Sequence, residues 1–323
     1  MIRTTLPTAL GLAFLLAVAP ATAAPRVVAD IAPVQSIAAR VMAGIGAPDV
    51  LLPPGASPHG YSLRPSEARM LEAADLVVWV GPDLTPWLAG PIGALARDAT
   101  VLTLEEAPGV VVLPARAGDG FEAHPHDEDD LAHEHEHADD PADAHHGPRD
   151  GHLWLDPENA VAAARAIAAA LGTLDPAGAP AYAANAEAFA AETADLVRAI
   201  SAELAPLRGR PYLVFHDAYQ YFEHRFDLPA AGSVALHDGV SPGAARVAAL
   251  RDRVRAEGFV CAFAEPQFEP KLLATIVEGS DVRTATLDPL GAALPAGPGL
   301  YPALIFGLAD GLAECLADPG SAR

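Results

Sequence analysis

The sequence predicts an α/β protein of two lobes, each a mostly parallel sheet flanked by helices, joined by one long rigid linker helix. Three observations predict this fold class. Short β-rich runs alternate with helical stretches, the alternation occurs twice, and a run of strong helix formers separates its two occurrences. The length of 323 residues fits the same division, because a domain has about 150 residues.

A signal peptide is predicted at residues 1–23. Arg3 precedes an apolar run over 9–19, and small residues follow at 21–24, which is the arrangement of a charged region, an apolar region and a cleavage site. The apolar run is too short for a bilayer, which needs about 20 residues, so a membrane anchor is the less favoured alternative. Cleavage near Ala23 predicts an exported protein. Because no cysteine lies near the cleavage site, the protein is not expected to be a lipoprotein.

The first lobe is expected over residues 24–176. Its strands are predicted at 27–31, 76–80 and 110–113, and its helices at 34–44 and 65–74.

The linker helix is expected within residues 177–208. Ala179–Leu207 consists almost entirely of strong helix formers and would be roughly 40 Å long as a helix. Phe189, Leu196 and Leu204 recur on one face of it. A single helix of this kind is a stiff connection that permits little hinge motion.

The second lobe is expected over residues 209–323. Its strands are predicted at 212–215, 259–263 and 282–287, and its helices at 241–257, 269–278 and 301–316. Both cysteines, Cys261 and Cys315, fall in this lobe. In an exported protein they are expected to form a disulfide, and two buried free thiols are the alternative.

Residues 119–150, inside the first lobe, form a different kind of segment. They contain twelve acidic residues against Arg149 alone, and seven of the twelve histidines. Too little apolar area is available to offset the entropy of ordering, so the segment is predicted to be disordered, and its composition is typical of metal binding. A solvated acidic linker is the alternative. The seven histidines are His124, His126, His133, His135, His137, His145 and His146.

The residues His133–His137 match the H-E-x-x-H pattern of zinc proteases. That motif requires a rigid amphipathic helix, which places the two imidazoles one turn apart and directs the glutamate at a bound water. The flanking residues here offer no apolar face for a helix. We interpret the match as a coincidence, and no catalytic residue is predicted.

Three histidines outside this segment occupy the expected positions of ligands. His59 lies in a turn-rich loop after the run 50–52, and His216 ends the strand 212–215. In open α/β sheets, ligands bind beyond the carboxyl ends of the strands. His152 lies where the acidic segment ends, and three converging imidazoles suit zinc.

These histidines also lie in motifs that resemble a known family. The mature chain resembles the periplasmic zinc-binding proteins of ABC importers, of the ZnuA type in cluster A-I. An acidic His-rich loop before the second histidine is typical of the zinc branch. The matching stretches are Gly55–Ser66, Ala74–Gly81, His152–Pro157, Phe215–Tyr219 and Thr286–Gly291.

The resemblance implies that His59, His152 and His216 are the primary ligands, since manganese-type relatives have a carboxylate in place of the last of these. An imidazole there favours zinc over manganese. The resemblance also implies a Cys261–Cys315 bridge.

The fourth ligand is less defined. Some relatives have a glutamate immediately before the first histidine, but Pro58 occupies that position here. Asp288, which ends the strand 282–287, is therefore predicted as the fourth ligand, with a water as the alternative. Asp217 is a candidate for orienting an imidazole, and Glu265 matches no ligand position.

The implied function is capture of Zn²⁺ between the lobes and delivery to an inner-membrane permease, with zinc as the transported ligand, by a monomeric periplasmic protein that is not an enzyme. Loading by a zinc metallochaperone is left open. A formal net charge of −22 excludes nucleic acid as a partner. A secreted zinc hydrolase and an exported zinc-buffering or adhesive protein are the alternatives.

Overall fold

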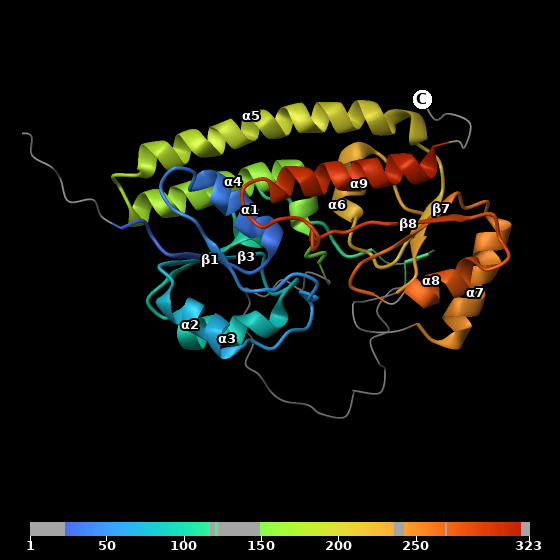
Figure 1. The fold of residues 1–323 in the computed structure, drawn as a ribbon, viewed down its shortest axis with the longest axis horizontal. Helices are drawn as coiled ribbons and strands as arrows, with labels where there is room; N and C mark the ends of the chain where they lie inside the picture. Colours follow the sequence, from blue (N-terminus) through green and yellow to red (C-terminus); the bar gives the residue numbers. More distant parts are fainter. Residues whose placement is uncertain (1–22, 117–119, 122–148, 236–241, 269, 318–323) are drawn as a thin grey trace, which may run out of the picture.

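Two four-stranded sheets organise the protein (Figure 1). The structure, a computed structural model, describes residues 23–116, 120–121, 149–235, 242–268 and 270–317. The strand pairings are parallel in both sheets, with the orders β2-β1-β3-β4 and β6-β5-β7-β8. The predicted two-lobed α/β class is confirmed. The strands are β1 (Val27–Ala29), β2 (Asp49–Val50), β3 (Leu76–Trp79), β4 (Thr100–Thr103), β5 (Tyr212–Val214), β6 (Gly232–Ser233), β7 (Cys261–Ala264) and β8 (Arg283–Thr286).

Helices cover both faces of the first sheet. Val27 and Ala29 of β1 join the core formed with α1 and α4, whereas Val28 joins a separate cluster with α2 and α3. Because both faces are buried, the strands are continuous apolar runs rather than alternating ones. The helices are α1 (Ala32–Val41), α2 (Pro65–Ala73), α3 (Ala89–Leu95) and α4 (Pro157–Leu174).

The second sheet is covered in the same way. Leu213 of β5 packs with apolar residues of α7 and α8, and Tyr212 and Val214 on its other face join the main core. The helices that follow this sheet's strands are α6 (Gln220–Phe226), α7 (Ala244–Ala256) and α8 (Pro270–Val277).

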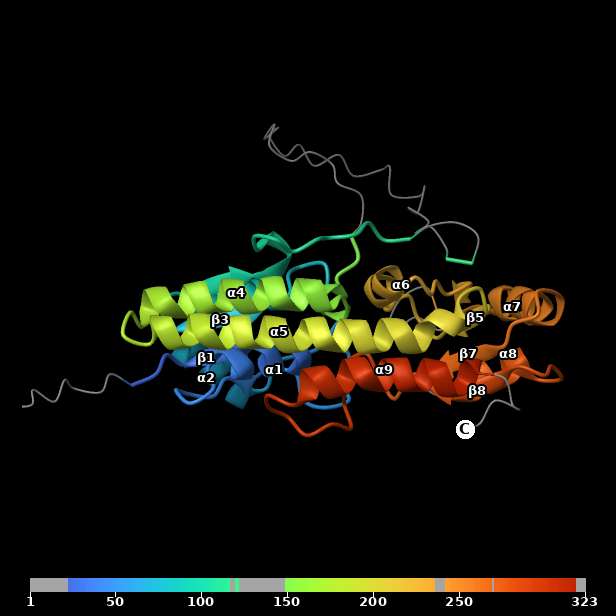
Figure 2. The same ribbon diagram turned by 90° about the horizontal axis from the view of Figure 1, so that it is seen from above.

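One long helix runs along both lobes, and a second lies beside its later half, with its start next to α1 (Figure 2). The predicted linker is α5 (Ala179–Leu204), which continues as a 3-10 turn over Ala205–Leu207. The second is α9 (Leu300–Leu316). Buried residues of α5 and α9 belong to one hydrophobic cluster that also contains residues of both sheets. The lobes therefore share a continuous core instead of being joined by the linker alone.

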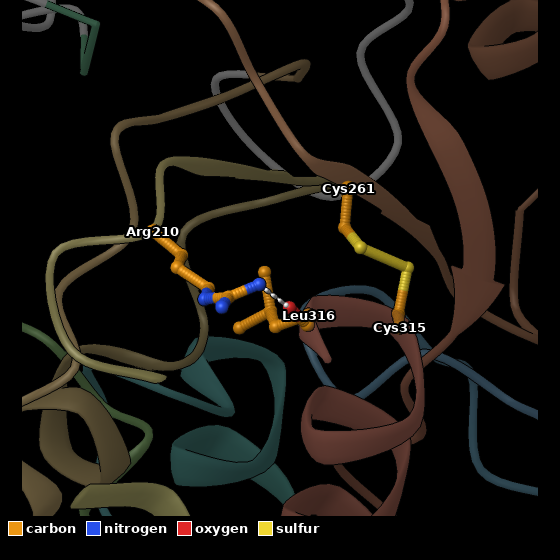
Figure 3. The surroundings of a disulfide bond; sticks show 4 residues. All are labelled: Arg210, Cys261, Cys315 and Leu316. Atoms are coloured by element: carbon orange, nitrogen blue, oxygen red, sulfur yellow. Dashed lines mark hydrogen bonds between the residues drawn. A yellow bond between two sulfur atoms is a disulfide. The ribbon is translucent and has the colours of Figure 1, made fainter. Parts of the chain in front are cut away.

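Helix α9 is fastened to the first lobe at its start and to the second lobe at its end. The Tyr301 N–H donates to Ser36 Oγ at 2.9 Å, and the Tyr301 hydroxyl donates to the Trp154 carbonyl at 2.9 Å. At the other end, the expected disulfide joins Cys315 to Cys261 of β7, with their Cα atoms 6.1 Å apart (Figure 3). Arg210 also donates to the Leu316 carbonyl at 2.7 Å. No described helix is long and apolar enough to cross a membrane.

The prediction of a strand at 110–113 is wrong, and β4 at Thr100–Thr103 takes its place in the sheet. The segment joins neither four-stranded sheet: the Leu113 carbonyl accepts the Asp150 N–H at 2.9 Å, beside an isolated bridge between Pro114 and Arg149, and other backbone groups bond to side chains. The Val111 N–H donates to Asn159 Oδ1 at 2.8 Å, and the Leu113 N–H donates to the Tyr221 hydroxyl at 2.9 Å. An apolar run in the sequence does not by itself distinguish a strand of the sheet from an extended segment that lies outside it.

Asp30, at the carboxyl end of β1, is expected to make folding pH-dependent. Its carboxylate is buried and accepts the N–H groups of Ile31 and Val80 at 2.8 Å each. Burial raises its pKa from 3.8 to about 7, so between these values the folded state holds a proton that the unfolded state loses. The free energy of unfolding therefore falls as pH rises through this window, with a slope of about 1.4 kcal/mol per pH unit.

The Asp30→Asn variant should lose this contribution, because the amide cannot ionise and its oxygen can still accept a backbone N–H. The measurement is urea unfolding of both proteins from pH 4 to pH 8. An identical pH dependence in the two proteins would contradict the assignment.

Candidate metal centre

Three histidines from distant parts of the sequence lie together between the two lobes. His59 lies in the loop after β2, His152 precedes the 3-10 turn Leu153–Leu155, and His216 follows β5. One ring nitrogen of each lies within 4.8 Å of the others, and among the described residues no other group of metal-binding side chains meets this criterion. The structure brings together the three histidines that the sequence singled out.

The separations of these nitrogens match the dimensions of a zinc site. Nε2 of His152 lies 3.2 Å from Nε2 of His59 and 3.4 Å from Nε2 of His216. Zinc lies about 2.0–2.1 Å from an imidazole nitrogen, so two corners of its tetrahedron are about 3.3–3.4 Å apart. Both separations that involve His152 therefore fit an edge of a zinc tetrahedron, and the three ligand nitrogens all lie within 4.8 Å of one another.

Two buried carboxylates fix the orientation of two of the rings. Oδ1 of Asp150 lies 2.8 Å from Nδ1 of His152, and Oε1 of Glu265 lies 2.7 Å from Nδ1 of His216. In the neutral ring each Nδ1–H donates to its carboxylate, which leaves the Nε2 lone pair directed at the centre. The carboxylates also supply negative charge beside the position of a cation.

The loop that carries His59 is held by the rest of the first lobe. Trp87 Nε1 donates to the Pro58 carbonyl at 2.7 Å, and the His59 N–H donates to Ser57 Oγ at 3.2 Å. Gly55 adopts a φ of +79°, a conformation available to glycine that lets the chain turn before His59. His59 is half-buried and the other two histidines are buried, so the site is reached from the His59 side.

The predicted fourth ligand, Asp288, is not brought to this group. Its Oδ1 accepts the N–H groups of Leu290 at 3.1 Å and Gly291 at 2.9 Å, and its Oδ2 accepts that of Ala292 at 2.6 Å. The carboxylate therefore closes the turn after β8. Beside the histidines there is instead a cavity of about 10 Å³, lined also by Trp154, Glu265, Gln267, Phe268, Pro289 and Leu290. That is about the space of one water molecule or ion.

The remaining predicted residues lie elsewhere. Asp217 does not orient an imidazole but pairs with Arg116. The seven histidines of the acidic segment, and residues 1–22 of the predicted signal peptide, lie outside the described residues.

Sequence reasoning missed the roles of Asp150 and Glu265. The sequence did contain a signal for Asp150, because an acidic residue two positions before a ligand histidine is close enough for its carboxylate to contact the histidine ring. Glu265 stood at the end of a strand on the correct side, but its pairing with a histidine 49 residues earlier had no local signal.

Replacing Glu265 with glutamine should lower zinc affinity by about 10-fold, at the weak end of the 10–100-fold range for residues that support metal ligands. The amide oxygen can still accept from His216 Nδ1, but the charge is lost. Glu265→Ala should have the larger effect because it removes the acceptor too. Competitive zinc titration against a chromogenic chelator measures both, and unchanged affinity in the alanine variant would show that this carboxylate does not support the ligand.

Comparison with known proteins identifies the family. The sequence model of the family described as ZnuA, zinc-uptake complex component A periplasmic, matches residues 27–315. The chain belongs to the ZnuA family. The high-affinity zinc uptake system protein ZnuA of Brucella suis is 43% identical over 310 residues, covering 90% of this chain and 91% of that protein. The Yersinia pestis ZnuA is 38% identical over 296 residues, covering 91% and 92%.

Solved structures agree with the two-lobed fold. A crystal structure of ZnuA, 22% identical, superposes with a TM-score of 0.74 and covers 91% of this chain and 100% of its own. A zinc-bound ZnuA deletion mutant, 24% identical, superposes with a TM-score of 0.73 and covers 92% of this chain and 100% of its own. A laminin-binding protein of Streptococcus agalactiae, described as a bifunctional protein with adhesin and metal-transporting activity, is 22% identical. It superposes with a TM-score of 0.72 and covers 91% of this chain and 100% of its own.

Proposed function

We propose that this protein is the periplasmic zinc-binding component of an ABC importer, which captures Zn²⁺ between its lobes and delivers it to an inner-membrane permease. The observation that carries the proposal is the trio of Nε2 atoms, with separations of 3.2 and 3.4 Å that fit the edge of a zinc tetrahedron. Membership of the ZnuA family supports it. The signal peptide at 1–23, export to the periplasm and a monomeric state belong to the same proposal.

Zinc is the cargo that the donor set favours. Three imidazoles suit zinc, whereas manganese prefers carboxylate and other oxygen ligands. For the fourth corner a water is favoured over Asp288, because that carboxylate would have to release three backbone N–H groups to reach the ion. The cavity of about 10 Å³ beside the rings has room for that water.

A zinc hydrolase is the alternative with a similar ligand set. Catalytic zinc sites also combine three protein ligands with a water. They need space for a substrate beside that water, and pockets for organic ligands measure about 300 Å³ or more. The cavity of about 10 Å³ at these histidines does not offer it, which favours a protein that binds the ion alone.

The acidic His-rich segment is proposed to bind additional zinc more weakly and to raise its concentration near the cleft. An exported zinc buffer, in which this segment is the principal site, is the competing function.

The decisive experiment is competitive zinc titration of the protein from residue 24 onward. It is run beside His59→Ala and beside a variant in which residues 122–148 are replaced by a short Gly-Ser linker. His224→Ala is the matched control, since His224 is an exposed histidine on α6. One tight site that is lost in His59→Ala and kept in the other two variants supports the proposal. Tight binding that survives His59→Ala and disappears with residues 122–148 would show a histidine-segment buffer instead.

A further inference from the structure

Arg116 ties the chain that leaves the first lobe to the second lobe. After β4 the chain runs through residues 110–116 toward α6, and residues 120–121 lie against β6, where the Ser233 N–H donates to the Gly120 carbonyl at 3.1 Å. We call residues 110–116 and 120–121 the stem. Figure 2 shows this green segment passing from the side of α4 to the side of α6 and α7. At Arg149 the chain is back on the first lobe, paired with Asp83 and Glu105.

The Arg116 side chain joins two carboxylates of the second lobe. Its Nε lies 3.0 Å from each carboxylate oxygen of Asp217, and its Nη2 lies 3.2 Å from Oε1 of Glu223. The guanidinium also lies over the Phe121 ring, 3.8 Å from its centre. The side chains of Arg116, Asp217 and Glu223 are only 18%, 19% and 3% exposed, so water screens these ion pairs weakly.

The charges of this cluster depend on one another. Burial alone would lower the pKa of Arg116, but the carboxylates of Asp217 and Glu223 raise it above its ordinary value. Burial raises the pKa of Glu223, and Arg116 opposes that rise. Removing the guanidinium would therefore leave a buried carboxylate without its counter-charge.

Asp217 directly follows the ligand His216, so the cluster acts on the turn that carries a metal ligand. The other two ligands, His59 and His152, belong to the first lobe, from which the stem extends. We propose that Arg116 is a positioning residue of the metal site: by holding Asp217 it fixes the turn that presents His216 and slows the departure of bound zinc. This inference rests on the proposed function, because it assumes that the three histidines hold zinc.

The physical reason is that zinc release breaks the bonds to all three histidines, and a movement of His216 away from the first lobe would break them. Moving His216 away from the first lobe also pulls Asp217 against the stem, so the Arg116 ion pairs oppose the movement. A second ion pair joins the two lobes but does not contact the turn that carries His216. Arg225 of α6 pairs with Asp156, at the start of α4, through contacts of 2.7 and 2.8 Å. It joins the same two lobes and serves as the matched control.

The test uses the full mature protein, loaded with one equivalent of zinc, and follows transfer of zinc to excess chelator by stopped flow. Asp217→Asn weakens the tie to the ligand turn and leaves the Arg116–Glu223 pair intact. Arg116→Lys keeps the charge but loses the planar fork that contacts both carboxylates. Arg116→Ala is avoided, because an unpaired buried carboxylate can prevent folding. Arg225→Lys alters the control pair.

We expect zinc dissociation to be about 10-fold faster in Asp217→Asn and intermediate in Arg116→Lys, with one tightly bound zinc in each. The visible absorption of bound Co²⁺ should also change in these two variants and not in Arg225→Lys. An unchanged rate in Asp217→Asn, or an equal acceleration in Arg225→Lys, would overturn the inference. If the unmodified protein binds no zinc at the three histidines, the proposed function itself fails, and the two failures are distinguishable.

Discussion

Replacing His152 with alanine should lower zinc affinity by about two to three orders of magnitude. Tetrahedral zinc sites in proteins bind with about 10–16 kcal/mol, so one ligand of four contributes on the order of 3–4 kcal/mol. His152 is the central member of the group, since its Nε2 lies next to that of both other histidines. Without it, His59 of the first lobe and His216 of the second lobe are the only histidine ligands left, and the ligand that lies next to both is missing.

Isothermal titration in competition with a chelator measures this loss. The metal-free variant must first show the unfolding transition of the parent protein, because His152 is buried and its removal leaves a cavity. A double variant, His152→Ala with His59→Ala, should lose little more than either single variant once the tight site is gone. Retention of tight binding in a folded His152→Ala protein would place the principal site elsewhere.

The second large effect is expected from the disulfide. Replacing both Cys261 and Cys315 with alanine should lower the free energy of unfolding by about 4 kcal/mol, the chain-entropy value for a closed loop of this size. The two cysteines are 54 residues apart in sequence. Alanine is preferred to serine because both positions are buried and would leave a serine hydroxyl away from water.

Denaturant unfolding with and without a thiol reductant isolates the cross-link from the loss of two side chains. Under oxidising conditions the unmodified protein should be the more stable by the full amount. Under reducing conditions most of the difference should disappear, because both unfolded chains are then open. A difference that persists in reductant would mean that packing, and not the cross-link, stabilises this end of α9.

The three histidines could be predicted because each lies at a recognisable position in its own segment. His216 ends a strand, and His59 lies in a loop rich in proline and glycine after another. The fold class was predictable for a similar reason, since strands covered on both faces are apolar runs that alternate with helices. These features are local, and one stretch of sequence is enough to show them.

The parts that could not be predicted depend on pairs that are distant in the sequence. Glu265 supports His216, and Arg116 contacts Asp217 from 101 residues away. Asp288 is a different case: its place after a strand suggested a ligand, and the local bonds that its oxygens accept from the next turn of the chain are not visible in the sequence pattern. Helix α9 was assigned to the second lobe alone, because the apolar pattern of its sequence does not show which of its residues contact α1 of the first lobe.

The position of α9 has a consequence for the order in which the molecule is completed. Its residues, 300–316, are synthesised after every other element described in the structure, yet they contribute to the core of both lobes. A chain that still lacks this helix would already have α5 joining the lobes, but it would miss the contacts of α9 with α1 and α5 and the bonds of Tyr301 to Ser36 and Trp154. The final relation of the two lobes, and with it the complete metal site, should therefore be reached only after this last helix has been made and has packed.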